Sequence, residues 1–227
     1  MVTVILFVYG SCLGSLIVAL AWRYAQQASY WSPASHCDSC QQPLKVWQLV
    51  PILSYLLLRG RCHFCHAPIP FTALLVEIIG GLVATTISDN FSLRVTLWLI
   101  LWGFAALCDA QTLTFPGWVT WVTAGLALVG QPSMVWGIGL GLLFLIHRLW
   151  PHWHSPTIGD GDLEMLVSAG LLWGVTITAQ WLIIACLLAI SRARTTDRLP
   201  FLPYLTTAAT GHWLVTVILT SSWVTPQ

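Results

Sequence analysis

Charged side chains are scarce in this sequence of 227 residues. Asp, Glu, Lys and Arg make up 7% of the chain, where an ordinary soluble domain carries roughly a quarter, and hydrophobic residues make up 57%. This composition predicts an all-α polytopic membrane protein, because a bilayer solvates apolar surface and requires every backbone polar group to be bonded internally. The formal net charge of +1 offers no basic surplus for phosphates, which argues against a nucleic-acid partner.

Two further absences limit the possible functions. No glycine-rich Rossmann fingerprint is visible, so the residues themselves do not indicate a nucleotide-type cofactor. No positively charged segment precedes the first apolar run, at residues 2–22, and Arg23 follows it. That arrangement predicts a retained signal anchor and not a cleaved signal peptide.

The apolar runs predict about eight transmembrane helices. A helix needs roughly 20 residues to cross a bilayer, and some of the runs are shorter than that. They lie at residues 2–22, 71–88, 93–109, 115–130, 133–150, 163–175, 176–190 and 201–222. The sequence therefore divides into a first transmembrane helix (1–22), a polar insert (23–70) and a seven-helix membrane bundle (71–227).

The basic residues predict the orientation in the membrane. With the insert in the cytoplasm, only Arg94 among the nine Lys and Arg residues lies outside. The other eight, all inside, are Arg23, Lys45, Arg59, Arg61, Arg148, Arg192, Arg194 and Arg198. This topology also puts Asp109 and Asp162 at the cytoplasmic ends of their spans, at the same depth in the cell membrane.

These two aspartates are the candidate catalytic residues. An acid at the edge of hydrocarbon is costly unless it faces a bundle interior or a wet cavity, so a functional role is the first interpretation. Two carboxyl groups close together do not ionise equally, and one can act as base on a water while the other donates a proton. That is the chemistry of an aspartyl protease dyad.

The neighbours of Asp162 are the candidate supporting residues. Gly159 and Gly161 remove side chains around the acid and let a substrate strand approach. Asp160 lies two residues from Asp162 and points to another side of the helix, so its simpler interpretation is a helix cap. Glu164 lies four residues after Asp160, and both are expected on a face of the helix that is exposed to water.

Glu77, in the first turns of the second span, is open to two interpretations. One is a buried structural hydrogen bond, and the other is a contact with substrate.

The insert carries four of the seven cysteines as two C-x-x-C pairs, Cys37 with Cys40 and Cys62 with Cys65. Two such pairs, 21 residues apart, are typical of four-thiolate zinc sites, and four cysteines leave no position open for water, so the zinc would be structural. Cys62 to His66 also spells the C-x-x-C-H pattern of c-type haem attachment, which is disfavoured because that chemistry belongs outside the cytoplasm.

At this point the motifs resemble the type IV prepilin peptidase family, and in particular the competence-type prepilin peptidases of Gram-positive bacteria. The matching segments are Gly10 to Ser15, Ser32 to Cys40, Pro51 to Tyr55, the second cysteine pair, Glu77, Asp109 with Pro116, and the G-x-G-D motif Gly159 to Asp162. The resemblance extends from residue 10 to about 166 and departs from the family pattern at Gly117, where an acid is usual, and at Glu164, where Lys is usual.

The resemblance implies an aspartyl endopeptidase that removes the short basic leader from type IV prepilin-like or competence pseudopilin precursors at the cytoplasmic face. It implies Asp109 and Asp162 as the catalytic pair and a metal-binding tetracysteine element. Because many members also methylate the new amino terminus, it implies S-adenosylmethionine as a second cofactor. Membrane lipids are the remaining expected partners.

Two alternatives from other classes stay open on the residues alone. In one, the chain is a cation or metal transporter, with Asp109 and Asp162 on the ion path and the thiolates sensing or delivering zinc. In the other, it is a membrane redox protein that uses the C-x-x-C pairs. The scarcity of further acids within the spans disfavours a cation path, and the equal depth of two acids beside glycines favours the protease.

Overall fold

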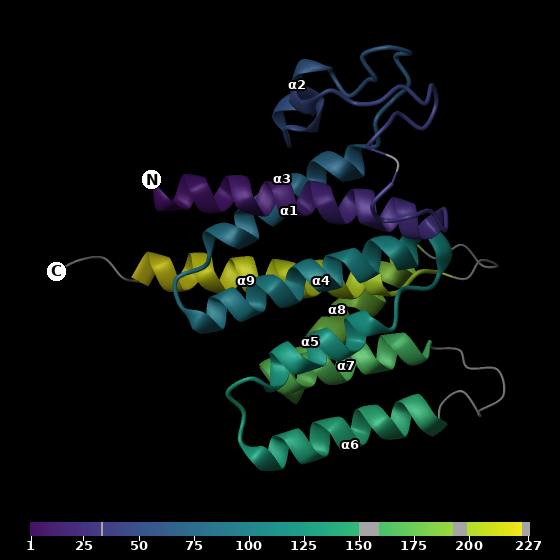
Figure 1. Cartoon of the computed structure of the whole chain (residues 1–227). Helices are drawn as coiled ribbons and strands as arrows, with labels where there is room; N and C mark the ends of the chain where they lie inside the picture. The colour runs from purple at the N-terminus through teal and green to yellow at the C-terminus, as the bar shows by residue number, and fades with distance from the viewer. Residues whose placement is uncertain (33, 150–158, 193–198, 224–227) are drawn as a thin grey trace. The chain divides into compact units, whose positions relative to one another are not determined.

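The computed structural model describes residues 1–32, 34–149, 159–192 and 199–223, and a helix lies at each predicted apolar run (Figure 1). These helices are α1 (Val2–Ala25), α3 (Phe71–Thr85), α4 (Asn90–Thr112), α5 (Trp118–Leu128), α6 (Ser133–Leu149), α7 (Asp160–Trp173), α8 (Val175–Arg192) and α9 (Leu202–Trp223). The all-α prediction is confirmed. Gly174, with a φ of +83°, separates α7 from α8 at the predicted boundary. Arg194 and Arg198 lie outside the described residues.

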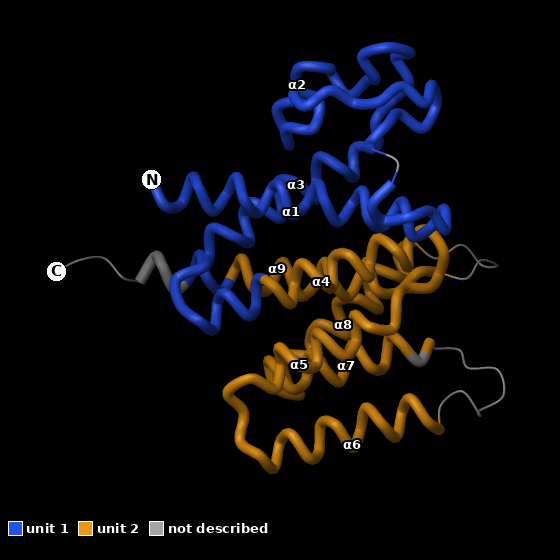
Figure 2. Tube along the Cα trace, viewed as in Figure 1, with its two compact units in different colours: residues 1–96, 216–227 blue, residues 97–215 orange. Residues whose placement is uncertain are grey.

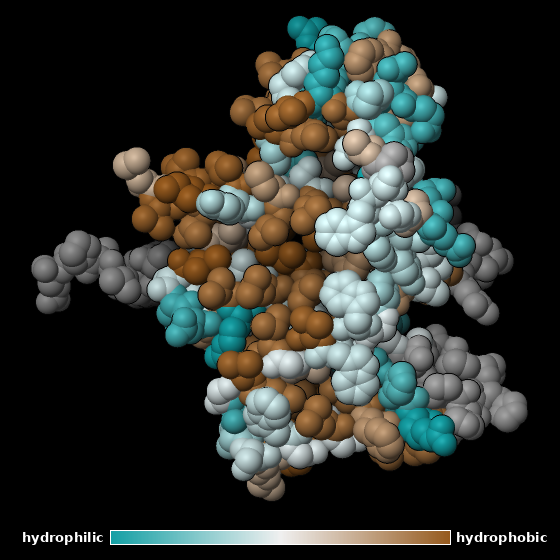
Figure 3. Space-filling view, viewed as in Figure 1, coloured by the Kyte–Doolittle hydropathy of each residue, from teal (hydrophilic) through white to brown (hydrophobic). Residues whose placement is uncertain are grey.

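Three of the described helices, α1, α4 and α8, are long and apolar enough to cross a membrane. The helices α3, α5 and α6 are also apolar but shorter. Many large hydrophobic side chains point outward, as on the face shown in Figure 3. Phe144 on α6 and Leu187 on α8 are both more than 60% exposed. Outward apolar surface of this extent is what lipid solvates, and it agrees with a membrane protein.

The chain forms two compact units, drawn in different colours in Figure 2. Unit 1 comprises residues 1–96 and 216–227, and unit 2 comprises residues 97–215. The insert and α3 belong to unit 1, while both candidate catalytic aspartates belong to unit 2.

In unit 1, glycines allow α1 and α3 to pack closely. A Cβ added at Gly14 would lie 2.7 Å from the carbonyl oxygen of Val76, and one added at Gly80 would lie 2.7 Å from that of Gly10. Gly10 and Gly14, small residues four apart on α1, therefore let α3 approach closely.

The start of α4 is fixed by a reciprocal cap. The Asp89 carboxylate accepts the Ser92 N–H (2.8 Å), and the Ser92 hydroxyl oxygen accepts the Asp89 N–H (2.9 Å). These bonds satisfy amide groups that have no partner within the helix. The Ser92 hydroxyl group also donates to the Asp89 carboxylate, and this bond, with that from the Ser92 N–H, holds the pKa of Asp89 below its usual value.

Aromatic side chains fill much of the core of unit 2. Trp98 and Trp102 on α4 and Trp181 on α8 are fully buried. The rings of Trp98 and Trp102 have centroids 4.0 Å apart, and Trp181 lies 6.3 Å from Trp98. This cluster packs α4 against α8, and it belongs to the same unit as the end of α4 that carries Asp109.

Candidate functional site

Asp109 lies in the last turn of α4, where the helix passes into the loop before α5. The residue is 7% exposed, and its Oδ2 accepts a hydrogen bond from the backbone N–H of Leu202 at 3.1 Å. Leu202 begins α9, so that N–H has no partner within its own helix. A buried carboxylate thus satisfies a helix terminus and is itself held in one orientation.

Asp162 lies in the first turn of α7, whose N-cap is Gly159. A Cβ built at Gly159 would stand 3.5 Å from Asp162 Oδ2. The missing side chain therefore leaves room directly beside this carboxylate. The side chain of Asp160 lies outside the described part of the structure, so its predicted place on the wetted face stays a prediction.

One pocket of unit 2, about 230 Å³ in volume, has both aspartates in its wall. Asp109, Leu113, Thr114, Phe115, Gly117, Thr120, His147, Gly159, Gly161, Asp162 and Glu164 line it. Three carboxyl groups, three glycines and two hydroxyl groups thus meet around one space, together with the imidazole of His147 at the end of α6. A peptide strand and a water can enter a space of this kind, and the carboxyl groups can exchange protons with them.

Gly161 is required by the packing of Phe115. A Cβ added at Gly161 would lie 2.8 Å from Phe115 Cε1 and closer still to Phe115 Cζ. Real Cβ atoms do not approach that closely, so only glycine lets the ring lie against the start of α7. From the sequence, Gly161 was interpreted as leaving room for a substrate strand. The structure shows that it also leaves room for the Phe115 ring.

His147 and Glu164 form an ion pair in the same pocket. His147 Nδ1 at the end of α6 lies 3.1 Å from Glu164 Oε1 on α7, and the two side chains are 61% and 8% exposed. The expectation that Glu164 lies on a wetted face is wrong, because α6 covers that side of α7 and His147 supplies a partner. Sequence analysis missed the pair, since its members lie 17 positions apart in the sequence.

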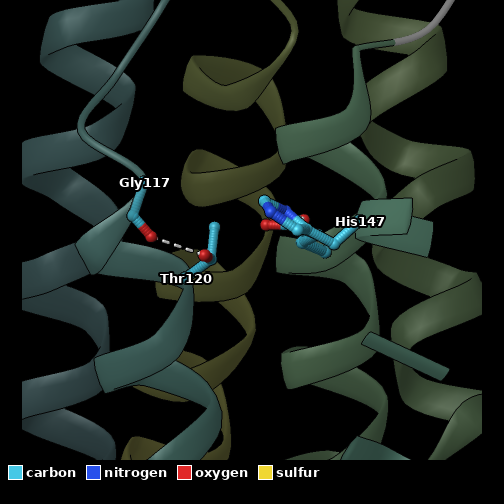
Figure 4. A network of polar contacts seen from close by, with 4 residues as sticks. Gly117, Thr120 and His147 are labelled. Carbon is cyan, nitrogen blue, oxygen red and sulfur yellow. Dashed lines mark hydrogen bonds and ion pairs between the residues drawn. The ribbon is translucent and has the colours of Figure 1, made fainter. Parts of the chain in front are cut away.

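Thr120 completes this side of the pocket. Its hydroxyl group donates to the carbonyl oxygen of Gly117 at 2.7 Å, and the side chains of Thr120 and His147 face the same space (Figure 4). Gly117 is the N-cap of α5, and a Cβ there would meet nothing within 4 Å. The acid usual in the family at this position therefore has open space in this chain.

Glu77 does not line the pocket of unit 2. It is buried on α3 in unit 1, where its Oε2 accepts the backbone N–H of Ile52 at 2.7 Å. Ile52 has a φ of +62°, an unusual conformation for a β-branched residue, and is the N-cap of the short helix α2 (Leu53–Leu57). The carboxylate thus ties the insert to α3, which favours the structural interpretation of Glu77.

The insert contains two matching cysteine turns. Cys37 N–H donates to Gln42 O and Cys62 N–H donates to Ala67 O, at 3.0 and 2.8 Å. Each turn also has a left-handed residue directly after its second cysteine, Gln41 in one and His66 in the other. The insert therefore contains a structural repeat of one cysteine turn, which the two C-x-x-C pairs signal and sequence analysis did not extract.

The four thiol groups of Cys37, Cys40, Cys62 and Cys65 converge. Their sulfur atoms all lie within 4.8 Å of one another, and Cys37 Sγ is 3.8 Å from Cys65 Sγ. A tetrahedral zinc with Zn–S bonds of about 2.3 Å has sulfur–sulfur edges of about 3.8 Å. The donor set and spacing thus fit a four-thiolate metal site, as predicted from the sequence.

Backbone amides near Cys62 favour the thiolate form of this candidate metal ligand. Those of Cys65 and Phe64 lower the pKa of the Cys62 thiol to about 6. N–H groups directed at sulfur favour the thiolate, which is the form that binds a metal.

Comparison with known proteins agrees with the motifs. The model of the bacterial peptidase A24 N-terminal domain matches residues 8–91. A prepilin leader peptidase/N-methyltransferase of Burkholderia pseudomallei is 31% identical over 76% of this chain and 64% of its own length. The proteins of that name from Neisseria gonorrhoeae and Bacillus subtilis are 28% identical over 71% of this chain and 26% identical over 92%.

The coverage of these relatives differs. The chain spans 62% of the Neisseria protein and 92% of the Bacillus protein. It covers a little less than two thirds of several relatives, including the Neisseria and Burkholderia proteins. No solved structure matches the chain.

Proposed function

Since the chain belongs to the type IV prepilin peptidase family, we propose that it is a membrane aspartyl endopeptidase. Its substrates are type IV prepilin-like precursors, including competence pseudopilins, from which it removes the leader peptide. The observation that carries this proposal is the pocket of unit 2, whose wall contains both Asp109 and Asp162 beside two glycines.

In the proposed mechanism the two aspartates share one proton. The ionised carboxylate takes a proton from a water held between the pair, and the resulting hydroxide attacks the carbonyl carbon of the scissile peptide bond. The protonated partner donates its proton to the carbonyl oxygen. Collapse of the tetrahedral intermediate then breaks the C–N bond, and the leaving amine receives a proton from the dyad.

The surrounding contacts support this chemistry. The hydrogen bond from Leu202 fixes one oxygen of Asp109, so that its carboxyl group does not need to reorient during catalysis. Gly159 leaves space beside Asp162 for an extended substrate strand. The ion pair of His147 and Glu164 lies on the α6 side of the pocket, where the imidazole is the partner of the third carboxylate in the wall.

We also propose that the site faces the cytoplasm, in the cell membrane. Asp109 is at the end of α4 and Asp162 at the start of α7, so an even number of crossings between them, through α5 and α6, returns the chain to the same side. The basic residues of the insert and of the ends of α6 and α8 lie on that side under the positive-inside rule. A basic leader held in the cytoplasm would then reach the site without crossing the bilayer.

Zinc is the metal proposed for Cys37, Cys40, Cys62 and Cys65. Four thiolates in a tetrahedron select zinc or iron–sulfur chemistry, and paired C-x-x-C turns favour a single zinc ion. With every ligand supplied by cysteine the ion has no catalytic position. It would hold together an insert that lacks a large hydrophobic core.

Methylation of the new amino terminus is proposed from the names of the relatives. S-adenosylmethionine would supply the methyl group. Among the described residues we assign none to its binding, so no catalytic step is derived through it.

The proposal is tested with purified protein reconstituted in lipid nanodiscs and synthetic prepilins that contain the leader and the first hydrophobic segment. Mass spectrometry is expected to find the free leader and the shortened pilin. Failure to cleave several different prepilins by a folded, zinc-loaded protein would contradict the proposal and favour the transporter alternative. Uptake of zinc or monovalent cations by proteoliposomes measures that alternative directly.

A further inference from the structure

The insert presents an apolar face that its own core does not use. Leu53, Leu56 and Leu57, at positions i, i+3 and i+4 of α2, all point outward, and Leu57 is 73% exposed. Val46, 84% exposed, and Trp47 extend this surface from the preceding turn η1 (Val46–Leu49), which packs beside α2. We call these five residues the insert face. In Figure 3 hydrophobic side chains gather where Figure 1 places α2.

The insert face is held in a fixed orientation. On the other side of α2, Tyr55 meets Phe71 with ring centroids 6.5 Å apart, and Glu77 binds the N–H of Ile52. Gly60, with a φ of +68°, turns the chain back over Tyr55 directly after α2. The exposed leucines therefore belong to a helix that is anchored on its other side, and not to a loop.

Three cations accompany the insert face. Lys45 precedes η1, and Arg59 and Arg61 follow α2; all three are exposed, and none has an ion-pair partner among the residues that the structure describes. The sequence holds no acid between Asp38 and Glu77, and Glu77 is buried and bound to Ile52. Lys45, Arg59 and Arg61 thus place positive charge on both flanks of the insert face, with no carboxylate to offset it there.

From this combination we propose that the insert face rests on the anionic headgroup surface of the membrane. Leucines at helical spacing, an amphipathic Trp and flanking cations are what an interfacial membrane-binding element requires. The apolar helices α1 and α3 of the same unit directly precede and follow the insert in the sequence, and they keep it beside the bilayer. A positive surface attracts lipid phosphates and repels a basic leader peptide, so lipid is favoured over substrate as the occupant.

A photo-crosslinking experiment tests this contact in the full-length protein. A photoreactive amino acid replaces Leu57, and in a matched control it replaces Gln42, an exposed polar residue of the first cysteine turn. Each protein is reconstituted in nanodiscs of phosphatidylcholine with or without phosphatidylglycerol. We expect a lipid adduct at position 57 that increases with phosphatidylglycerol, and little adduct at position 42.

The charges are tested in the Leu57-substituted protein by Lys45→Gln, Arg59→Gln and Arg61→Gln together. The adduct with phosphatidylglycerol should fall several-fold, because each basic residue near an anionic surface contributes about a fivefold preference. Retained zinc shows that the insert is still folded. Equal adducts at both positions, or no effect of the three substitutions, would overturn the proposal. A crosslink to added prepilin in place of lipid would also overturn it and would assign the insert face to substrate. None of these outcomes depends on proteolysis.

Discussion

His147 Nδ1 lies 3.1 Å from Glu164 Oε1 in the wall of the pocket that also contains Asp109 and Asp162. Glu164 is nearly buried, so its charge needs this partner, while His147 is largely exposed and reaches it from the end of α6. The pair joins two helices that the chain connects only through residues 150–159. It therefore fixes the spacing of α6 and α7 beside the candidate catalytic pair.

Replacing His147 alone should destabilise the protein, and replacing Glu164 as well should restore part of the lost stability. We expect His147→Gln to lower the free energy of unfolding by about 1 kcal/mol, a modest value because the imidazole is exposed. The double variant with Glu164→Gln should be no less stable than the single variant, since no buried charge then remains unpaired. Thermal unfolding of all four proteins in one detergent measures the coupling. Strict additivity of the two changes would show that the contact contributes nothing.

Gly161→Ala should displace Phe115 and disturb the pocket. The added Cβ would lie within 2.8 Å of ring atoms, which forces the ring or the start of α7 to move. Displacement by about 1 Å near reacting groups lowers rates by about a hundredfold. Gly170→Ala is the control on the same helix, because a Cβ there meets nothing within 4 Å. Prepilin cleavage that falls equally in both variants would contradict this account.

The two interpretations of Glu77 predict different outcomes for two substitutions. Glu77→Gln keeps an acceptor for the Ile52 N–H, whereas Glu77→Ala leaves that amide unsatisfied at a cost of about 1–3 kcal/mol. If the role is structural, hydrogen exchange in α2 should accelerate in the Ala variant and stay near the parental rate in the Gln variant. A Gln variant with parental exchange but strongly reduced cleavage would instead favour contact with substrate.

Metal analysis is expected to find one zinc ion per chain. Chelation, or Cys62→Ser, should loosen the insert and make it sensitive to protease while the membrane helices remain folded. Without metal the Cys62 thiol has a pKa of about 6, below its usual value, so the thiolate is stable above that pH and is lost as the pH falls through it. Bound zinc lowers this pKa further. Protons compete with zinc for all four thiolates, so zinc should be released as the pH falls, and release that increases as the pH rises would contradict the assignment.

The positions of the helices could be predicted because each long apolar run must satisfy its backbone internally, which in lipid means a helix. The boundary near Gly174 was placed between two adjacent apolar runs, and the cysteine cluster followed from the spacing of its two pairs. These features are local in the sequence. The convergence of Asp109 and Asp162 on one pocket was expected from their equal depth in the membrane.

Contacts between distant segments were less accessible to sequence analysis. The partner of Glu164 was missed because hydropathy does not say which side of α7 is covered by α6. The packing of Phe115 on Gly161 depends on the path of a loop, and the bond between Glu77 and Ile52 depends on how the insert folds back on α3. In each case the informative quantity is a distance between elements, which no single stretch of sequence contains.

The central claim is that Asp109 and Asp162 act together. It is tested most directly by the rate of prepilin cleavage by Asp109→Asn and Asp162→Asn in nanodiscs, with zinc content and thermal unfolding matched to the parent. Asp89→Asn is the control, because Asn also caps a helix and Asp89 does not line the pocket. We predict loss of cleavage in each pocket variant and parental cleavage in the control. Parental activity in either pocket variant would contradict the dyad.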